Sequence, residues 1–145
     1  MEVKKNLLVD ERGVPLSIVV TGANRHDSAV LEELLHRRVT PLDCGRHDRI
    51  TQNLCLDAGY VGKAQVVSHN GMTPHIRPRG EEKKAIELHG FKPKRWIVEV
   101  AHSWFNRFRK IHARYEKTDL AYYGLLHLAA AMITMNKVMR IYPES

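Results

Sequence analysis

The chain has 145 residues, of which 43% are hydrophobic and 27% charged, so it is long enough for one globular domain with a buried core, covering residues 1–145. Its two cysteines, Cys44 and Cys55, form no CxxC pair, so the sequence indicates neither a zinc ribbon nor a disulfide scaffold. No signal-peptide pattern is present, and the uncharged stretch at residues 120–135 is too short to cross a membrane, so we expect a cytoplasmic protein without membrane contact.

The positive charge of the chain is concentrated in one segment. Lysine and arginine outnumber aspartate and glutamate by 23 to 16, a formal net charge of +7. Residues 77–117 hold 12 basic and 5 acidic side chains, whereas the remainder is neutral, with 11 of each. A localised basic band favours a polyanion partner, and nucleic acid is the expected one; a solvated surface that binds nothing is the alternative.

The chain begins with a predicted hairpin and a helix. Two β-rich runs within residues 7–20 flank a turn from Asp10 to Gly13, which predicts an antiparallel pair. A helix is expected over residues 26–38, with Asn24 or Asp27 as its N-cap and leucines on its buried side.

The middle of the chain predicts a strand that ends at a carboxylate. Residues 50–56 form this strand, and Asp57 follows at its carboxyl end, the edge of an open α/β sheet where ligands collect. An Asp in a turn near a glycine is also common, so position alone leaves a purely structural role open. A short helix over residues 63–70 and a short strand over 73–77 come next, and the last helix is expected over 119–140, with its uncharged part buried.

Residues 95–117 predict an amphipathic helix with two stripes. The large apolar residues recur in steps of four and three, as one buried stripe requires: Trp96, Val100, Trp104, Phe108 and Ile111. A second stripe on a neighbouring face holds Arg95, Glu99, His102 and Asn106. Glu99 is therefore expected beside the core, either as an ordinary ion-pair partner of Arg95 or as a functional carboxylate. The aromatic residues of the first stripe are expected to pack in the core rather than to stack on bases.

Several motifs together resemble a known family. Trp-x2-Glu followed by HSWFNRFRK and RYEK is similar to the C-terminal catalytic segment of bacterial insertion-sequence transposases of the DDE class. LLVDERGVPLSIVVTGANRHDSAVLEELL and LDAGYVG are also similar, so the resemblance covers about residues 7–138. Within the class it is most similar to the fifth numbered insertion-sequence family.

The resemblance implies an α/β, ribonuclease-H-like fold in which Asp57 and Glu99 are two of three catalytic, metal-binding carboxylates. The metal is expected to be Mg²⁺ or Mn²⁺, since phosphodiester cleavage and strand transfer use hard cations held by carboxylate oxygens. In such transposases the first Asp lies on a central strand upstream of the hairpin. Neither Asp10 nor Asp27 is a convincing substitute, so we expect an incomplete sheet whose first, central strand is missing. The C-terminal helices would still be present.

Basic residues on and around the helix with Glu99 are the expected contacts to DNA phosphates. They are Arg95, Arg107, Arg109, Lys110, Arg114 and Lys117. Transposon ends and target DNA are the expected partners, together with a second copy of the chain or an upstream transposase segment. The sequence departs from the family pattern at Val100, Lys92 and Asn106, which weakens the expectation of activity.

Three hypotheses follow from these patterns. The first is a C-terminal transposase fragment that retains two catalytic carboxylates, binds DNA, and cleaves only when the upstream part is supplied. The second is a non-catalytic truncated protein that binds DNA or a full-length transposase and interferes with it. The third is a decayed remnant without function.

Overall fold

The computed structural model describes residues 3–39, 52–76, 81 and 96–141, with the side chain of Ile141 left out. Strands come first and helices dominate the C-terminal half, so the predicted mixed α/β class is confirmed. The elements in chain order are β1 (Val3–Val9), β2 (Pro15–Gly22), α1 (Asp27–His36), β3 (Gln52–Leu56), the 3-10 helix η1 (Ala58–Tyr60), α2 (Ala64–His69), β4 (Met72–Ile76), α4 (Trp96–Asn106), α5 (Arg109–Ala113) and α6 (Asp119–Ile141).

The hairpin of β1 and β2 is antiparallel, as the sequence predicts. Asp10 closes its turn, because one carboxylate oxygen accepts hydrogen bonds from the backbone N–H groups of Arg12, at 2.9 Å, and Val14, at 2.8 Å. Gly13 has φ +81°, and a Cβ there would lie 3.0 Å from the ring of Trp104. The turn therefore needs glycine both for its backbone and for the close approach of α4.

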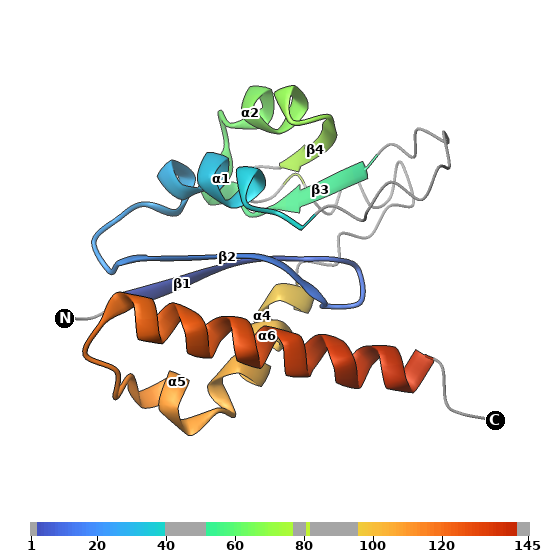
Figure 1. Ribbon diagram of the computed structural model, residues 1–145. Helices are drawn as coiled ribbons and strands as arrows, with labels where there is room; N and C mark the ends of the chain where they lie inside the picture. Colours follow the sequence, from blue (N-terminus) through green and yellow to red (C-terminus); the bar gives the residue numbers. More distant parts are fainter. Residues whose placement is uncertain (1–2, 40–51, 77–80, 82–95, 142–145) are drawn as a thin grey trace.

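Helices cover both faces of this hairpin (Figure 1). Because successive strand residues point to opposite faces, Leu7 packs with Phe105 and Leu126 of the C-terminal helices, whereas Leu8 packs with Val30 of α1. Two hydrophobic clusters result, one on each side of the hairpin. The hairpin is thus the middle layer of a helix–strand–helix arrangement.

The other two strands, β3 and β4, pair in parallel and are connected through α2. Leu54, Val67 and Met72, one from each of β3, α2 and β4, are buried in the same cluster as α1. Among the described strands, β1 pairs with β2 alone and β3 with β4 alone, giving two separate two-stranded sheets.

The single helix predicted over residues 95–117 is wrong in its length and in its buried face. Helix α4 ends at Asn106, Phe108 has extended backbone (ψ 104°), and α5 ends at Ala113, before Arg114, whose φ is +42°. The buried side chains of α4 are Ile97, Ala101 and Phe105, one position after the predicted stripe.

The two tryptophans of α4 show why the predicted stripe is displaced. Ala101 is fully buried, and its small side chain lets α4 lie close to the hairpin, whereas Trp96 is 59% exposed. Trp104 and Phe108 are only partly buried, although both pack against the core as predicted, and Ile111 is buried. The two tryptophans therefore mark the edge of the contact, and Ile97, Ala101 and Phe105 mark its centre.

The last helix is longer than the uncharged stretch and is not buried all round. One face carries Tyr122, Leu126, Ala129 and Ile133 into the core. The opposite face is exposed, with Leu120 at 85%, so the prediction of a buried helix is correct for one face alone. Among the helices of the described residues, none is long and apolar enough to cross a membrane.

Candidate functional site

Asp57 lies directly after β3, at the carboxyl end of the parallel pair, where the sequence predicts it. Its backbone is extended, and its carboxylate accepts a hydrogen bond from the N–H of Ala58 at 2.7 Å, which caps the 3-10 helix η1. The side chain is exposed. One oxygen thus fixes the local turn while the carboxylate remains accessible to a cation.

Tyr60 shows that a second carboxylate lies near this strand end. Burial raises the pKa of Tyr60 to about 12, and the negative charges of Asp27 and Asp57 add to the effect. Asp27 opens α1 and forms an ion pair with Lys4 of β1, at 2.5 Å. The first turn of α1 and the end of β3 therefore place two carboxylates around one phenol.

Glu99 lies in the first turn of α4 and is exposed, which corrects the expectation that it sits beside the core. The reason is the displaced stripe: with Ile97 and Ala101 facing inward, the intervening Glu99 points outward. Arg95, its predicted ion-pair partner, lies outside the described residues. A negatively charged side chain at this position is favoured by the positive end of the helix dipole.

The second predicted stripe of α4 is partly confirmed, because its C-terminal residues, His102 and Asn106, lie near β1. Lys5 donates a hydrogen bond to Asn106 at 2.7 Å, joining α4 to β1. Burial lowers the pKa of His102, and the charges of Lys5 and then Lys4 lower it further. Burial also lowers the pKa of Lys5. Burial and the two lysines therefore both favour the neutral form of His102.

Asp57 follows β3 and Glu99 lies on α4, so the two predicted carboxylates come from separate elements of the described residues, 3–39, 52–76, 81 and 96–141. In the same ranges, no group of three or more His, Cys, Asp or Glu side chains comes together in a way that could hold a metal ion. Both carboxylates have the oxygen ligands that Mg²⁺ and Mn²⁺ prefer, so their chemistry fits a divalent cation. The described residues alone do not assemble its complete site.

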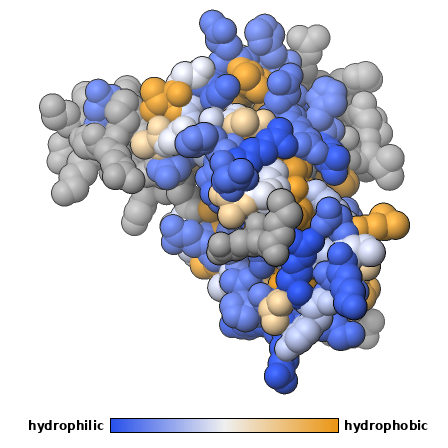
Figure 2. Space-filling view, turned by 90° about the vertical axis from the view of Figure 1, so that its left-hand side faces the viewer, coloured by the Kyte–Doolittle hydropathy of each residue, from blue (hydrophilic) through white to orange (hydrophobic). Residues whose placement is uncertain are grey.

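Four of the predicted DNA-contacting residues are exposed around α5: Arg107, Arg109, Lys110 and Lys117. Arg114 is only partly accessible, because its guanidinium bonds to Asp119 at 2.5 Å and lies over the ring of Tyr122, 5.1 Å from the centroid. Its charge is engaged in holding α5 against α6, so its assignment as a free phosphate contact is weakened. Figure 2 shows the side at which β1 and α6 begin, where hydrophilic residues cover most of the surface and hydrophobic ones form separate patches.

Residues 54–136 match the family model described as "Transposase DDE domain". This match covers more than half of the chain and includes both Asp57 and Glu99. The chain belongs to the DDE transposase domain family.

A protein assigned as a transposase for insertion sequence element IS402, from Burkholderia cepacia, is 27% identical to this transposase domain over 141 residues. The alignment covers 94% of this chain and 64% of that relative, so the chain spans less than two thirds of the relative's length. No solved structure matches the chain. The resemblance to insertion-sequence DDE transposases is thus confirmed, while the number of the family stays a prediction.

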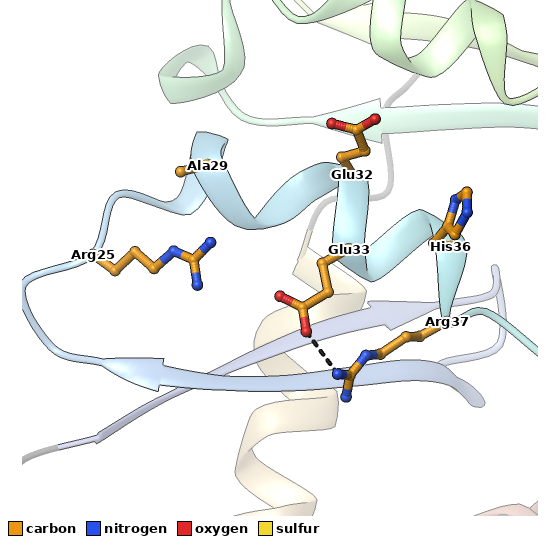
Figure 3. A pocket seen from close by; sticks show the side chains of 6 residues that line it. All are labelled: Arg25, Ala29, Glu32, Glu33, His36 and Arg37. Carbon is orange, nitrogen blue, oxygen red and sulfur yellow. Dashed lines mark ion pairs between the residues drawn. The ribbon is translucent and has the colours of Figure 1, made fainter.

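A surface hollow of the transposase domain lies elsewhere, along the outer side of α1. It has a volume of about 490 Å³ and is lined by Arg25, Ala29, Glu32, Glu33, His36 and Arg37 (Figure 3). Glu33 and Arg37 form an ion pair of 2.8 Å within it, one helical turn apart. Neither Asp57 nor Glu99 lines this hollow, and the exposed pair is an ordinary helix-surface contact.

The sequence did not reveal the surroundings of the two carboxylates. Tyr60 was visible only as part of the motif after Asp57, and nothing in the spacing placed Asp27 near its ring. The contacts of Lys4 and Lys5 were likewise missed, since both precede the residues used for the resemblance. Each of these contacts joins segments far apart in sequence, for which periodicity gives no signal.

Proposed function

We propose that this domain is the C-terminal part of a ribonuclease-H-like transposase catalytic domain, and that Asp57 and Glu99 are two of its metal-binding carboxylates. The observation that carries the proposal is the match to the DDE transposase family over the segment that contains both residues. Asp57 at a strand end and Glu99 on a helix both have exposed side chains, so both carboxylates are accessible to a cation.

The strand arrangement supports the incomplete sheet. Antiparallel β1–β2 and parallel β3–β4 have no described strand between them, and one more strand that pairs with β1 and with β3 would join them into one mixed sheet. Such a strand would satisfy backbone N–H and C=O groups on both edges. Its carboxyl end would lie near Asp57 if it ran parallel to β3, which is the place for a third carboxylate.

The residues of the chain have distinct roles in this proposal. Mg²⁺ or Mn²⁺ would supply charge stabilisation of the attacking and leaving oxygens in phosphodiester cleavage and strand transfer. Asp57 and Glu99 would hold the cation. The exposed basic residues around α5, Arg107, Arg109, Lys110 and Lys117, would bind the phosphates of transposon-end and target DNA.

The catalytic part is tested by joining the chain to an upstream segment that supplies the central strand and its Asp. We expect metal-dependent cleavage of transposon-end DNA by the extended chain, and loss of cleavage with undiminished DNA binding in Asp57→Asn and Glu99→Gln. Glu32→Gln, at an exposed carboxylate of α1, is the matched control and should cleave normally. An extended, folded chain that cleaves equally well with both substitutions would refute the assignment.

The DNA-binding part is tested by the salt dependence of affinity for duplex DNA. Each phosphate contact contributes about 0.9 to the slope of log K against log salt, so Ala at Arg109 and Lys110 together should reduce the slope by roughly two. Arg25→Ala removes one exposed positive charge near α1 instead, and should leave the slope unchanged. An equal change in both variants would show that net charge alone, rather than the α5 region, governs binding.

A second candidate is a chain that binds DNA without cutting it. It is favoured by the lack of an assembled three-ligand group in the described residues. Glu99→Ala separates the two functions, because interference with a full-length transposase through DNA binding should survive this substitution, whereas cleavage should not.

A further inference from the structure

The outer face of α6 carries a continuous apolar seam. Residues at steps of three, four, three, four and three along it are exposed and uncharged, and we call them the outer seam: Ala121, Gly124, Leu128, Ala131, Met135 and Val138. This is the heptad spacing of a helix that packs along another helix. Lys137, by contrast, points inward, donating to the carbonyl of Arg12 at 2.6 Å and lying over the Trp104 ring.

This seam is too apolar for a helix face that stays in water. The inner face of α6 already packs in the core, so the outer seam is a second apolar stripe on the same helix, and a helix with apolar residues on opposite faces typically packs on both. Leu128 is 59% exposed and Met135 56%. The side chains of Leu120, Met132, Val138 and Met139 are also exposed to solvent. Leu128, Met135 and Val138 belong to the seam, and Leu120, Met132 and Met139 flank it. At roughly 100 Å² for each of these six side chains, the seam and its flanks together expose on the order of 600 Å², about three quarters of the ~800 Å² per partner of a standard interface.

The order of small and large residues along the seam identifies the partner that fits it. When two copies of α6 cross antiparallel, with their midpoint between Ala129 and Ala130, positions equally distant from the midpoint face each other. Each resulting pair then joins a smaller residue to a larger one: Ala121 with Val138, Gly124 with Met135, and Leu128 with Ala131. A Cβ at Gly124 would have no atom of the described residues within 4 Å, so this position offers open space for the side chain of Met135 from a second copy.

We propose that the outer seam of α6 is a homodimer interface in which two copies of this chain pack antiparallel about a two-fold axis. A two-fold interface requires a surface that is complementary to itself, and the small–large pairing has this property. A parallel arrangement would set Gly124 against glycine and Leu128 against leucine, leaving gaps in one layer and crowding in the next. The seam is also free of charge, so it is a place where two chains of net charge +7 can meet with little repulsion.

This inference concerns assembly and does not depend on the catalytic role of Asp57 and Glu99. It is tested by sedimentation equilibrium of the full chain over a range of concentrations, with Gly124→Leu as the central variant. Leucine at this exposed helical position is favoured over glycine by helix propensity, so the variant should fold at least as well as the parent, as a thermal melt will show. Its side chain would occupy the space needed by Met135 of the second copy and should weaken self-association by at least about tenfold.

A compensating swap distinguishes this register from a general loss of association. Gly124→Leu combined with Met135→Ala restores a small–large pair and should recover much of the dimer, whereas Met135→Ala alone should weaken it. Leu16→Ala, at a partly buried position on the hairpin, is the control for lost apolar area away from the seam and should leave self-association unchanged.

Three outcomes would overturn the proposal. The first is a parent chain that stays monomeric at all concentrations. The second is a folded Gly124→Leu variant that dimerises as well as the parent. The third is a double variant that fails to recover association while both single variants stay folded. Binding of the monomer to phospholipid vesicles, lost in Gly124→Leu or Leu128→Glu, would assign the seam to a lipid surface instead.

Discussion

Tyr60 is the residue whose ionisation depends most directly on the candidate site. Its pKa is raised to about 12 by burial and then by the charges of Asp27 and Asp57. Neutralising one of these charges in Asp57→Asn should lower the pKa of Tyr60, while burial should still hold it above the ordinary value near 10. The titration is followed through the NMR signal of the Tyr60 ring carbon that carries the hydroxyl.

The matched control for Tyr60 is Asp119→Asn, which removes an exposed carboxylate at the start of α6. Its Tyr60 titration should equal that of the parent chain. An unchanged pKa in Asp57→Asn would mean that the Asp57 carboxylate does not lie beside the ring. Because the folded-state pKa is raised, the stabilisation from neutral Tyr60 is present below pH about 10 and is lost as the pH rises towards about 12.

His102 makes the stability of the chain depend on pH in the acid range. Its pKa is lowered in the folded chain, by burial first and then by Lys5 and Lys4. Protonation therefore favours the unfolded chain, and the stabilisation is present above pH about 6.5 and is lost as the pH falls through that value towards the folded-state pKa. His102→Gln should reduce the loss of stability between neutral and mildly acidic pH, measured by urea unfolding.

Exposed His112 on α5 provides the comparison for this pH effect. His112→Gln should leave the acid-side decline of stability as it is in the parent. If both histidine variants follow the same pH profile as the parent chain, the burial of His102 beside β1 has no measurable consequence and its proposed surroundings are wrong.

At the scale of elements, Tyr123 joins α6 to strand β2 of the hairpin through hydrogen bonds. Its hydroxyl accepts a hydrogen bond from the N–H of Val20 at 2.8 Å and donates one to the carbonyl of the same residue at 3.4 Å. Tyr123→Phe leaves both backbone groups without this partner and should lower the free energy of unfolding by roughly 1–2 kcal/mol. Chemical denaturation measures the difference.

Tyr115→Phe removes a hydroxyl from a side chain that is 63% exposed, so it should change the stability by less than about 0.5 kcal/mol. Equal effects of the two substitutions would show that the hydroxyl of Tyr123 does not hold the helix to β2. The prediction belongs to the packing of the fold and is independent of any catalytic role.

The sequence predicts those elements whose position is set by residues close together in the chain, and fails where a distant contact sets it. The hairpin was predictable because Asp10 and Gly13 carry the chemistry of its turn, and the strand before Asp57 because β-rich residues precede it. The phase of α4 was not predictable, because the size of Ala101 matters only once the hairpin lies against it. The break at Phe108 escaped prediction too, since no proline or glycine marks it.

The candidate site was predictable in identity and not in geometry. Asp57 and Glu99 followed from motif resemblance, and the family match contains both. Their exposure, the capping role of Asp57 and the neighbourhood of Tyr60 follow from tertiary contacts between segments distant in sequence. For the same reason the exposed outer face of α6 was mistaken for a buried one.

At the scale of the whole molecule, the central claim is that this chain, with its two separate sheets and two exposed carboxylates, holds part of a metal site. A cation that binds the folded chain in preference to the unfolded one raises its melting temperature, by an amount set by the ratio of concentration to dissociation constant. Two carboxylates that share a cation should each be required for this effect.

The most direct measurement is a thermal melt followed by circular dichroism, with and without Mg²⁺, for the parent chain, Asp57→Asn and Glu99→Gln, with Glu32→Gln as the control. We predict one cooperative transition that Mg²⁺ moves to higher temperature in the parent and the control, and not in either of the other variants. A cooperative parent melt without any shift, or a shift that persists in both variants, would contradict the assignment of Asp57 and Glu99 as partners in one metal site.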